Sequence, residues 1–245
     1  MTNNPFNRGA DSAGIERVGI DSGLRSHMLR IYNYMGLGVG VTGLVSWLIA
    51  NTPAINALFF DALTHRPTVL GMIAAFAPLA FVLFIGFASQ RSSASTLQGM
   101  FWLFCAVMGV SLASIFMYFT DESIARTFFV VAGMFAGTSL WGYTTKSDLS
   151  KMGSFMMMGL IGIIIAGIVN MFVHSSMLQF ITSILGVVIF VGLTAWDTQR
   201  IKDTYSESFG AEANDKMAIF GALNLYMNFI NLFQFMLQFM GSRRD

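Results

Sequence analysis

The sequence predicts an all-α integral membrane protein, organised as a bundle of seven transmembrane helices. Of its 245 residues, 55% are hydrophobic and only 11% are charged, whereas soluble domains carry about 25% charged residues. Its apolar residues also form runs of roughly 20 residues, the length that a helix needs to cross a bilayer. The formal net charge of +1 gives no case for a nucleic-acid partner. We therefore expect contact with membrane lipid and none with nucleic acid.

The chain divides into a polar start and one long apolar domain. Residues 1–26 contain no apolar core, so we predict a disordered cytoplasmic tail and no cleavable signal peptide. Residues 27–245 are predicted to form the seven-helix transmembrane domain, because no linker or change of composition divides them. The seven predicted spans are Arg30–Asn51, Thr68–Ser89, Leu97–Phe119, Ile124–Thr145, Lys151–Val173, Met177–Gln199 and Met217–Met240.

Basic residues are divided unequally between the two predicted sides of the membrane. If the N-terminus is inside, ten lysines and arginines lie on the inner side and four on the outer side, and cytoplasmic loops carry the excess of such residues. We therefore predict a cytoplasmic N-terminus. A re-entrant last segment would return Arg243 and Arg244 to the inner side, where basic residues are favoured. We prefer a full span, because Met217–Met240 is long enough to cross the membrane. The inner set is Arg8, Arg17, Arg25, Arg30, Arg91, Lys146, Lys151, Arg200, Lys202 and Lys216, and the outer set adds Arg66 and Arg126 to the C-terminal pair.

Small residues indicate where helices approach one another. Gly133 and Gly137 form a GxxxG pair in the fourth span, which is a helix-packing signal in an apolar segment. The run from Gly38 to Gly43 matches the GxGxxG pattern of dinucleotide-binding proteins, but no strand precedes it and it lies inside a predicted membrane helix. We interpret it as a site of close helix packing.

Asp197 is the only carboxylate inside, or at the rim of, a predicted span. A carboxylate costs roughly 2.5–3.5 kcal/mol at a bilayer centre and less near its edge. Two interpretations remain open with about equal weight. Asp197 is a functional group, or it caps the cytoplasmic end of the sixth span in headgroup water.

The last span carries a stripe of amide side chains. Asn224, Asn228, Asn231, Gln234 and Gln238 are separated by steps of four, three, three and four, which places all five on one helical face. Amides turned to lipid would lack hydrogen-bond partners, so the face must look into the bundle. It lines a polar path there, or it only joins helices by hydrogen bonds. Judged by its expected depth in the membrane, Asn224 is at least as good a partner for Asp197 as Asn228 is.

The polar residues of the spans do not match enzyme chemistry. The apolar segments hold no histidine, the Thr138-Ser139 region does not complete the GxSG pattern, and an aspartyl protease needs two membrane aspartates. Cys105 is the single cysteine, and the three histidines lack metal-ligand spacing. We therefore predict no enzyme, no metal site and no cofactor. An acidic group beside an amide stripe suits cation passage or proton sensing.

Four stretches resemble the Bax inhibitor family, also called the transmembrane Bax inhibitor motif family, in its bacterial branch. They are Asp197–Ile201, Gly221–Phe233, Gly142–Ser150 and Gly23–Met35. The resemblance implies a seven-helix bundle with the seventh helix central, in a bacterial inner membrane. It also implies a pH-sensitive calcium leak, in which two aspartates on the last two helices share a proton and an arginine bonds to one of them.

The chain departs from this family pattern at one position. The aspartate of the sixth helix corresponds to Asp197, but Asn228 stands where the second aspartate is expected, and an amide does not titrate. Arg91, just past the second span, is the basic residue nearest to the expected arginine. We therefore expect a calcium leak with Asp197 as its acidic sensor, Asn228, Asn224 and Asn231 as polar partners and Arg91 as a counter-ion. The alternative is a non-conducting regulator that binds another membrane protein, such as a membrane-bound protease.

Overall fold

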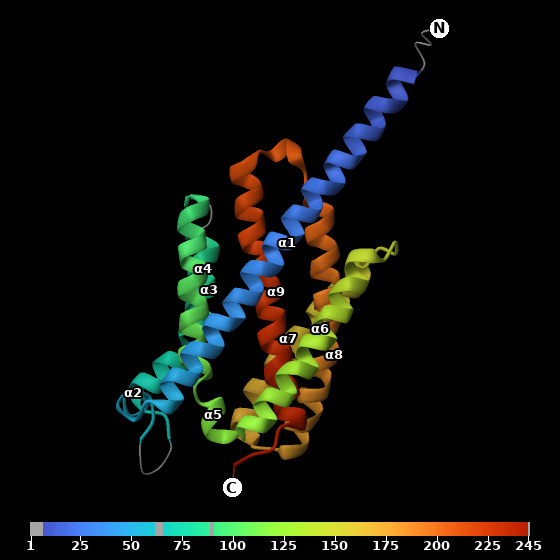
Figure 1. Cartoon of the computed structure of the whole chain (residues 1–245). Coiled ribbons are helices and arrows are strands. Elements are labelled where there is room, and N and C mark those ends of the chain that lie inside the picture. The colour runs from blue at the N-terminus through green and yellow to red at the C-terminus, as the bar shows by residue number, and fades with distance from the viewer. Residues whose placement is uncertain (1–6, 62–65, 89–90, 245) are drawn as a thin grey trace.

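The computed structural model describes residues 7–61, 66–88 and 91–244, with side chains described from Ser22 onward. These residues form helices and two isolated β-bridges, Phe60 with Pro67 and Phe119 with Arg243. The bounds of the helices are α1 Asn7–Asn51, α2 Pro53–Phe59, α3 Val69–Ala88, α4 Ala94–Leu112, α5 Ile115–Tyr118, α6 Asp121–Thr144, α7 Ser150–Val173, α8 Ser176–Thr204, the 3-10 turn η1 Glu207–Phe209 and α9 Ala211–Met240. Figure 1 shows α3, α4, α8 and α9 running roughly along one direction, with α1 crossing them diagonally.

Side-chain hydroxyls begin three of the long helices. Ser93, Thr120 and Ser175 each accept a hydrogen bond from the backbone N–H three residues later, at the starts of α4, α6 and α8. Such caps satisfy one of the N–H groups that a helix start leaves without an intrahelical partner. The short polar connections in the sequence therefore fix where these membrane-length helices begin.

Six helical stretches among the described residues are long and apolar enough to cross a membrane. They correspond to the first six predicted spans, which confirms an all-helical chain with membrane-length segments. α9 is not among them, because its asparagines and glutamines lower its hydropathy although it is a continuous helix of 30 residues. The six stretches are Ser22–Asn51, Val69–Ala88, Ala94–Tyr118, Asp121–Thr144, Ser150–Val173 and Ser176–Thr204.

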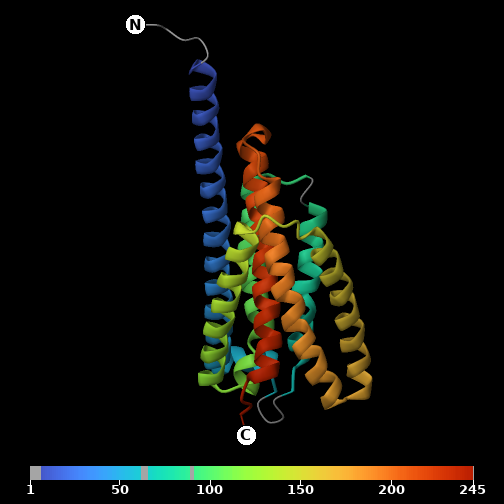
Figure 2. The same cartoon turned by 90° about the vertical axis from the view of Figure 1, so that its right-hand side faces the viewer.

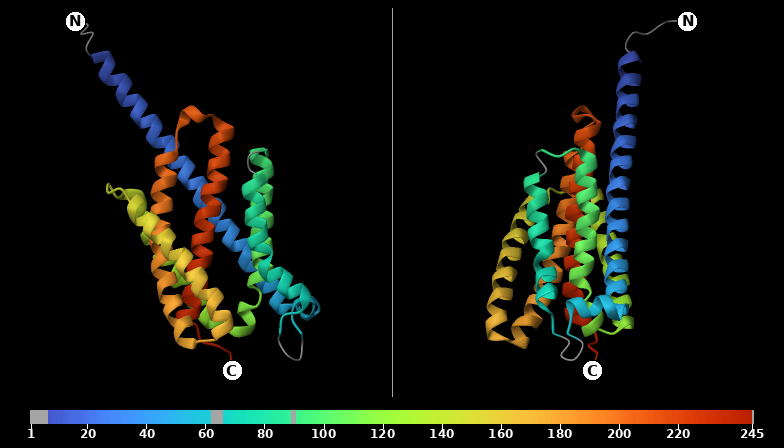
Figure 3. Two further views of the ribbon diagram at one scale, coloured as in Figure 1. Left: turned by 180° about the vertical axis from the view of Figure 1, so that it is seen from behind. Right: turned by 90° about the vertical axis from the view of Figure 1, so that its left-hand side faces the viewer.

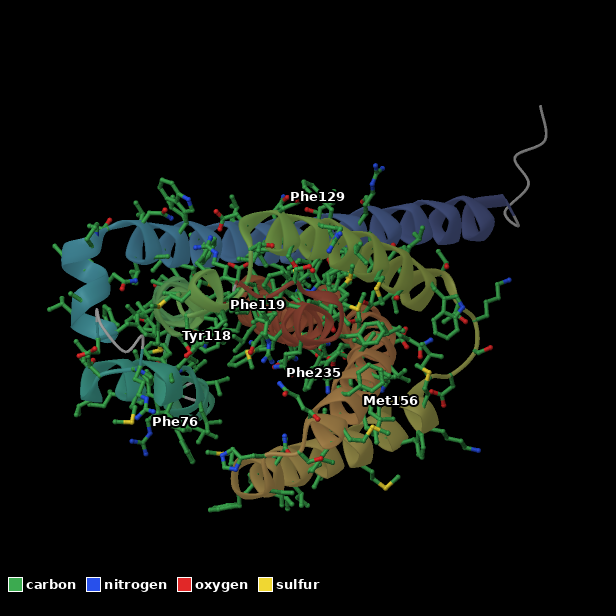
Figure 4. The ribbon with its side chains drawn as sticks, turned by 90° about the horizontal axis from the view of Figure 1, so that it is seen from below. Phe76, Tyr118, Phe119, Phe129, Met156 and Phe235 are labelled. Atoms are coloured by element: carbon green, nitrogen blue, oxygen red, sulfur yellow. The ribbon has the colours of Figure 1, made fainter. Side chains whose placement is uncertain are left out.

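α9 carries much of the buried surface of the molecule. It packs against α1, α4, α6 and α8, and Figure 4 shows its ribbon between these helices. Its fully buried Tyr226 makes edge-on ring contacts with Phe101 and Phe104 of α4, with ring centroids 6.0 and 5.8 Å apart. The Tyr226 hydroxyl also forms a 2.6 Å hydrogen bond with Thr42 of α1. These contacts hold α9, and with it the amide stripe, at a fixed position.

The two ends of the chain lie at opposite ends of the bundle. In Figures 1 and 2 the start of α1 and the α8–α9 connection lie at one end, and the C-terminal residues lie at the other. There the backbone N–H of Thr120 donates to the carbonyl of Ser242, and Arg244 forms an ion pair with Asp121 at 2.6 Å. The unbroken course of α9 contains no turn that a re-entrant segment would need.

The first helix begins earlier than the sequence analysis expected. α1 starts at Asn7 and includes residues 7–26, where we expected a disordered tail. Residues 1–6 of that tail lie outside the described residues. Residues 7–26 contain no proline, so every one of them can supply its backbone N–H to the helical hydrogen-bonding pattern, which continues through them.

Glycines mark close contacts, but not at the predicted GxxxG pair. A Cβ added to Gly133 or Gly137 would meet no atom within 4 Å, and both residues are exposed. A Cβ at Gly142, by contrast, would lie 2.8 Å from the Cα of Ala195 on α8, and one at Gly153 of α7 would overlap the indole of Trp196. Figure 3 shows α6 and α7 beside α8 from behind. The GxxxG pattern reports small residues but not which face of the helix they lie on.

Candidate functional site

Asp197 lies in the last two turns of α8 and is buried, with 7% of its surface exposed. Its Oδ2 atom accepts a 2.7 Å hydrogen bond from the side-chain amide of Asn228 on α9. Asn228 is itself only 5% exposed. The carboxylate and the amide therefore meet across the α8–α9 interface, where burial strengthens their interaction.

The amide stripe of α9 divides into two parts. Asn224, Asn228 and Asn231 line the same cavity as Asp197, whereas Gln238 accepts a 3.4 Å hydrogen bond from Ser183 of α8. The Asn231 amide also donates to the carbonyl of Met227 on its own helix, at 2.8 Å. Three asparagines face the cavity, and the last glutamine joins two helices.

This cavity has a volume of about 550 Å³ and lies between α3, α7, α8 and α9. Figure 4, which looks along the bundle, shows α9 and α8 on one side of this region and α3 and α7 at its edges. Its polar lining comes from α8 and α9, which also contribute apolar side chains, whereas α3 and α7 contribute apolar side chains alone. The polar lining is Asp197, Arg200, Asn224, Asn228 and Asn231, and the apolar lining includes Leu79, Leu160, Ile163 and Phe190.

Arg200 supplies the positive charge at this site. Its Nη2 atom lies 2.9 Å from Oδ1 of Asp197, and its guanidinium lies 4.7 Å from the ring centre of Trp196. The expected counter-ion, Arg91, is exposed in the turn between α3 and α4 and is not among the described residues that line the cavity. The spacing of three residues between Asp197 and Arg200 was the signal for this pair, since such positions are neighbours on a helix.

The other polar residues of the Asp197–Ile201 stretch fasten α8 to its neighbours. Gln199 accepts from the backbone of Leu149 at 2.8 Å and donates to the carbonyl of Ser147 at 2.9 Å, both in the α6–α7 connection. Thr198 shares a 2.9 Å hydrogen bond with Ser139 of α6, whose hydroxyl also bonds to that of Tyr32 on α1 at 2.6 Å. Nothing in the sequence indicates these partners, because they lie far away along the chain.

The α6–α7 connection held by Gln199 is also ordered from within. Hydrogen bonds from the hydroxyl and then from the backbone amide of Ser150 hold the pKa of the exposed Asp148 below its ordinary value. An ionised carboxylate at this position accepts the N–H of the first residue of α7, which favours the start of that helix. Two independent sets of hydrogen bonds therefore fix the loop beside the site.

The arrangement offers oxygen atoms to a hard cation. A carboxylate and three side-chain amides converge on one cavity, and such oxygens, completed by water, are the ligands that calcium prefers. The contact between Asp197 and Asn228 lacks the second carboxylate that would let two acids share one proton. The group at 228 is an amide, and it donates to Asp197 through its nitrogen.

Comparison with known proteins places this architecture in a family. Residues 24–245 match the family described as "Inhibitor of apoptosis-promoting Bax1". A protein of Caulobacter vibrioides is 47% identical over 99% of this chain and 100% of its own length. Protein RP147 of Rickettsia prowazekii is 44% identical over 92% of this chain and 93% of its own, and "Inner membrane protein YbhL" of Escherichia coli K12 is 41% identical over 91% and 94%. With its membrane-length helices, this integral membrane protein belongs to the Bax inhibitor family.

Proposed function

We propose that the protein is a calcium leak pathway influenced by pH, and that the cavity beside Asp197 is part of the route. The observation that carries this proposal is the convergence of Asp197, Asn224, Asn228 and Asn231 on one cavity of about 550 Å³. Four oxygen-bearing side chains are fewer than the six to eight ligands of a tight calcium site. A permeant ion needs such weak binding, because it must leave as well as enter.

In this proposal α9 is the seventh and central span. Its contacts with four other helices and the opposite positions of the two chain ends support an odd number of crossings. The N-terminus and the α8–α9 connection face the cytoplasm, since ten of the basic residues lie toward that end. The name of the Escherichia coli relative, "Inner membrane protein YbhL", supports an inner-membrane location for this protein as well.

Asp197 is the acidic sensor of the pathway. It is the one carboxylate among the described residues that line the cavity, so its protonation would remove the negative charge that attracts a cation. Arg200 is its resident counter-ion, and an entering calcium ion competes with the guanidinium for the carboxylate. The role is non-enzymatic, since binding and release of a cation require no reaction.

Calcium flux into liposomes tests this proposal. Reconstituted wild-type protein should pass calcium faster than empty liposomes do, and Asp197→Ala should alter the rate or its pH dependence. Asp203→Ala is the matched control, because Asp203 is on the same helix with its side chain 63% exposed and lies outside the cavity. Equal flux in empty, wild-type and Asp197→Ala liposomes would overturn the leak.

A non-conducting regulator is the second candidate function. The observation that favours it is the amide at Asn228, because a pathway gated by a shared proton needs a second carboxylate there. In that reading, the protein binds another membrane protein, such as a membrane-bound protease. Absence of flux in the liposome experiment would leave this candidate as the better account.

A further inference from the structure

A groove runs between α1 and α6 on the side of the molecule away from the Asp197 cavity, and a 2.6 Å hydrogen bond between Tyr32 and the buried Ser139 joins the two helices within it. Both helices pack on α9 more closely than on each other, and Figure 4 shows them on the same side of it. One cavity of about 510 Å³ lies between them toward the end where α1 begins, and a second of about 290 Å³ lies toward the other end. Each cavity is lined by residues of both α1 and α6.

Glycines keep the walls of this groove open between its two cavities. Gly36 follows Tyr32 by four residues and precedes Val39 by three, and those two residues line the first and second cavities. Gly133 lies between Phe129 and Ala136 in the same way on α6. Helical spacing therefore puts both glycines on the groove side of their helices, and a Cβ at either would meet no atom within 4 Å.

Polar groups gather at one end of the groove. Arg25, Tyr32 and Ser139 line the first cavity together with apolar side chains. Arg25 also borders a neighbouring cavity of about 760 Å³ that is lined by Arg30, Ser26 and Asn33 as well. The second cavity is mainly aromatic and aliphatic, and the carboxylate at its far end, Asp121, is neutralised by Arg244 at 2.6 Å.

The charge of Arg25 has no partner within the described part of the chain. Arg30 is paired with Asp215 of α9, whereas Arg25 forms no ion pair with any residue in 22–61, 66–88 or 91–244. An unpaired arginine at the mouth of an apolar groove matches a ligand with a negative head and an apolar tail.

We propose that the first cavity and the groove below it bind an anionic phospholipid, with its phosphate at Arg25 and an acyl chain between α1 and α6. The distance from Arg25 to Gly36 along α1 matches the thickness of one leaflet of the bilayer. Gly36 lies eleven residues beyond Arg25, or about 16 Å at 1.5 Å per residue, and half of a hydrocarbon core is about 15 Å. The acyl chain of the lipid would end where Gly36 and Gly133 leave both walls of the groove without side chains. A helix of a second copy would instead need the full length of the groove and gains nothing from Arg25.

Phospholipid retained by the purified full-length protein tests this site. Protein extracted in mild detergent from membranes containing phosphatidylglycerol is analysed by native mass spectrometry. Arg25→Gln should reduce bound phosphatidylglycerol about fivefold, since one arginine near an anionic lipid surface contributes about 1 kcal/mol. Lys151→Gln, an exposed lysine at the start of α7, should leave it unchanged. Equal retention in the two variants would overturn the proposal.

A second pair of variants tests the acyl-chain part of the groove. Gly133→Leu and Gly36→Leu place a side chain in open space, so the protein should fold while retaining less phosphatidylglycerol. Gly167→Leu, on the exposed face of α7, meets equally open space and should retain the wild-type amount. Unchanged lipid retention together with conversion of a dimer to a monomer by Gly133→Leu would show that a second copy occupies the groove, contrary to the proposal.

Discussion

Arg200 holds its guanidinium 2.9 Å from the carboxylate of Asp197, one helical turn away on α8, and stacks over Trp196 on the same helix. The arginine side chain is 46% exposed while that of the aspartate is 10% exposed. The positive charge therefore stands between bulk water and the buried carboxylate, at the edge of the cavity that three asparagines of α9 also line.

The first prediction concerns this ion pair. Arg200→Gln removes the competing charge and should raise calcium flux at neutral pH up to about fivefold, because a half-exposed ion pair contributes at most about 1 kcal/mol. Arg200→Lys keeps the charge but not the planar stacking on Trp196, so its flux should lie nearer to wild type. Stopped-flow measurement with a trapped calcium dye gives both rates. Identical flux in all three proteins would remove Arg200 from the pathway.

The second prediction concerns the contact between α6 and α8. Gly142→Ala places a Cβ 2.8 Å from the Cα of Ala195, and backbone cannot yield as a side chain can. We expect a loss of about 1–3 kcal/mol, the usual cost of overpacking. Gly137→Ala on the same helix meets open space and should be neutral, or stabilising by up to about 1 kcal/mol through helix propensity. Thermal unfolding in detergent compares the two, and a lower midpoint for Gly137→Ala would contradict this account.

The third prediction concerns topology. Cysteines are introduced at Ser22 or Ser242 in a chain whose buried Cys105 is replaced by alanine. The two ends of the bundle carry these positions, so an impermeant thiol reagent should label Ser22→Cys from the cytoplasmic side and Ser242→Cys from the opposite side. Labelling of both from one side would mean that α9 does not cross the membrane.

Hydropathy and helical spacing were sufficient to predict most of the fold. Long apolar runs gave the six membrane-length helices, and the regular steps between amides identified α9 as a helix with one polar face. The same spacing placed Asn228 on the face that meets Asp197. The expected depth in the membrane did not distinguish Asn224 from Asn228 as the partner of Asp197. How far α8 is shifted along α9 depends on helix packing, which the sequence pattern does not contain.

Other parts of the site depended on information that the sequence does not carry locally. Arg91 was expected near Asp197 through family resemblance, but the charge there comes from Arg200, three residues along the same helix. Gly133 and Gly137 matched a packing motif yet contact no other helix, while Gly142 makes the close contact. The partners of Gln199 lie in a loop some fifty positions earlier. Such pairings arise only when the helices have assembled.

The contact between Asp197 and Asn228 carries the central claim, because it makes one carboxylate the sensor of the proposed pathway. Asn228→Asp would place a second carboxylate against the first. Two ionised carboxylates this close together would repel each other. The pair should therefore hold one shared proton more tightly than Asp197 does beside an amide. Asn224→Asp is the matched control, since Asn224 lines the cavity but forms no hydrogen bond with Asp197 in the described structure.

The deciding measurement is a pH titration of calcium flux in liposomes containing wild-type protein, Asn228→Asp or Asn224→Asp. The account predicts that Asn228→Asp moves the midpoint of the flux-versus-pH curve upward by on the order of one unit or more, with a smaller movement for Asn224→Asp. Wild type should respond more weakly near neutral pH. Coincident midpoints for wild type and Asn228→Asp would contradict a sensor formed where Asp197 meets Asn228.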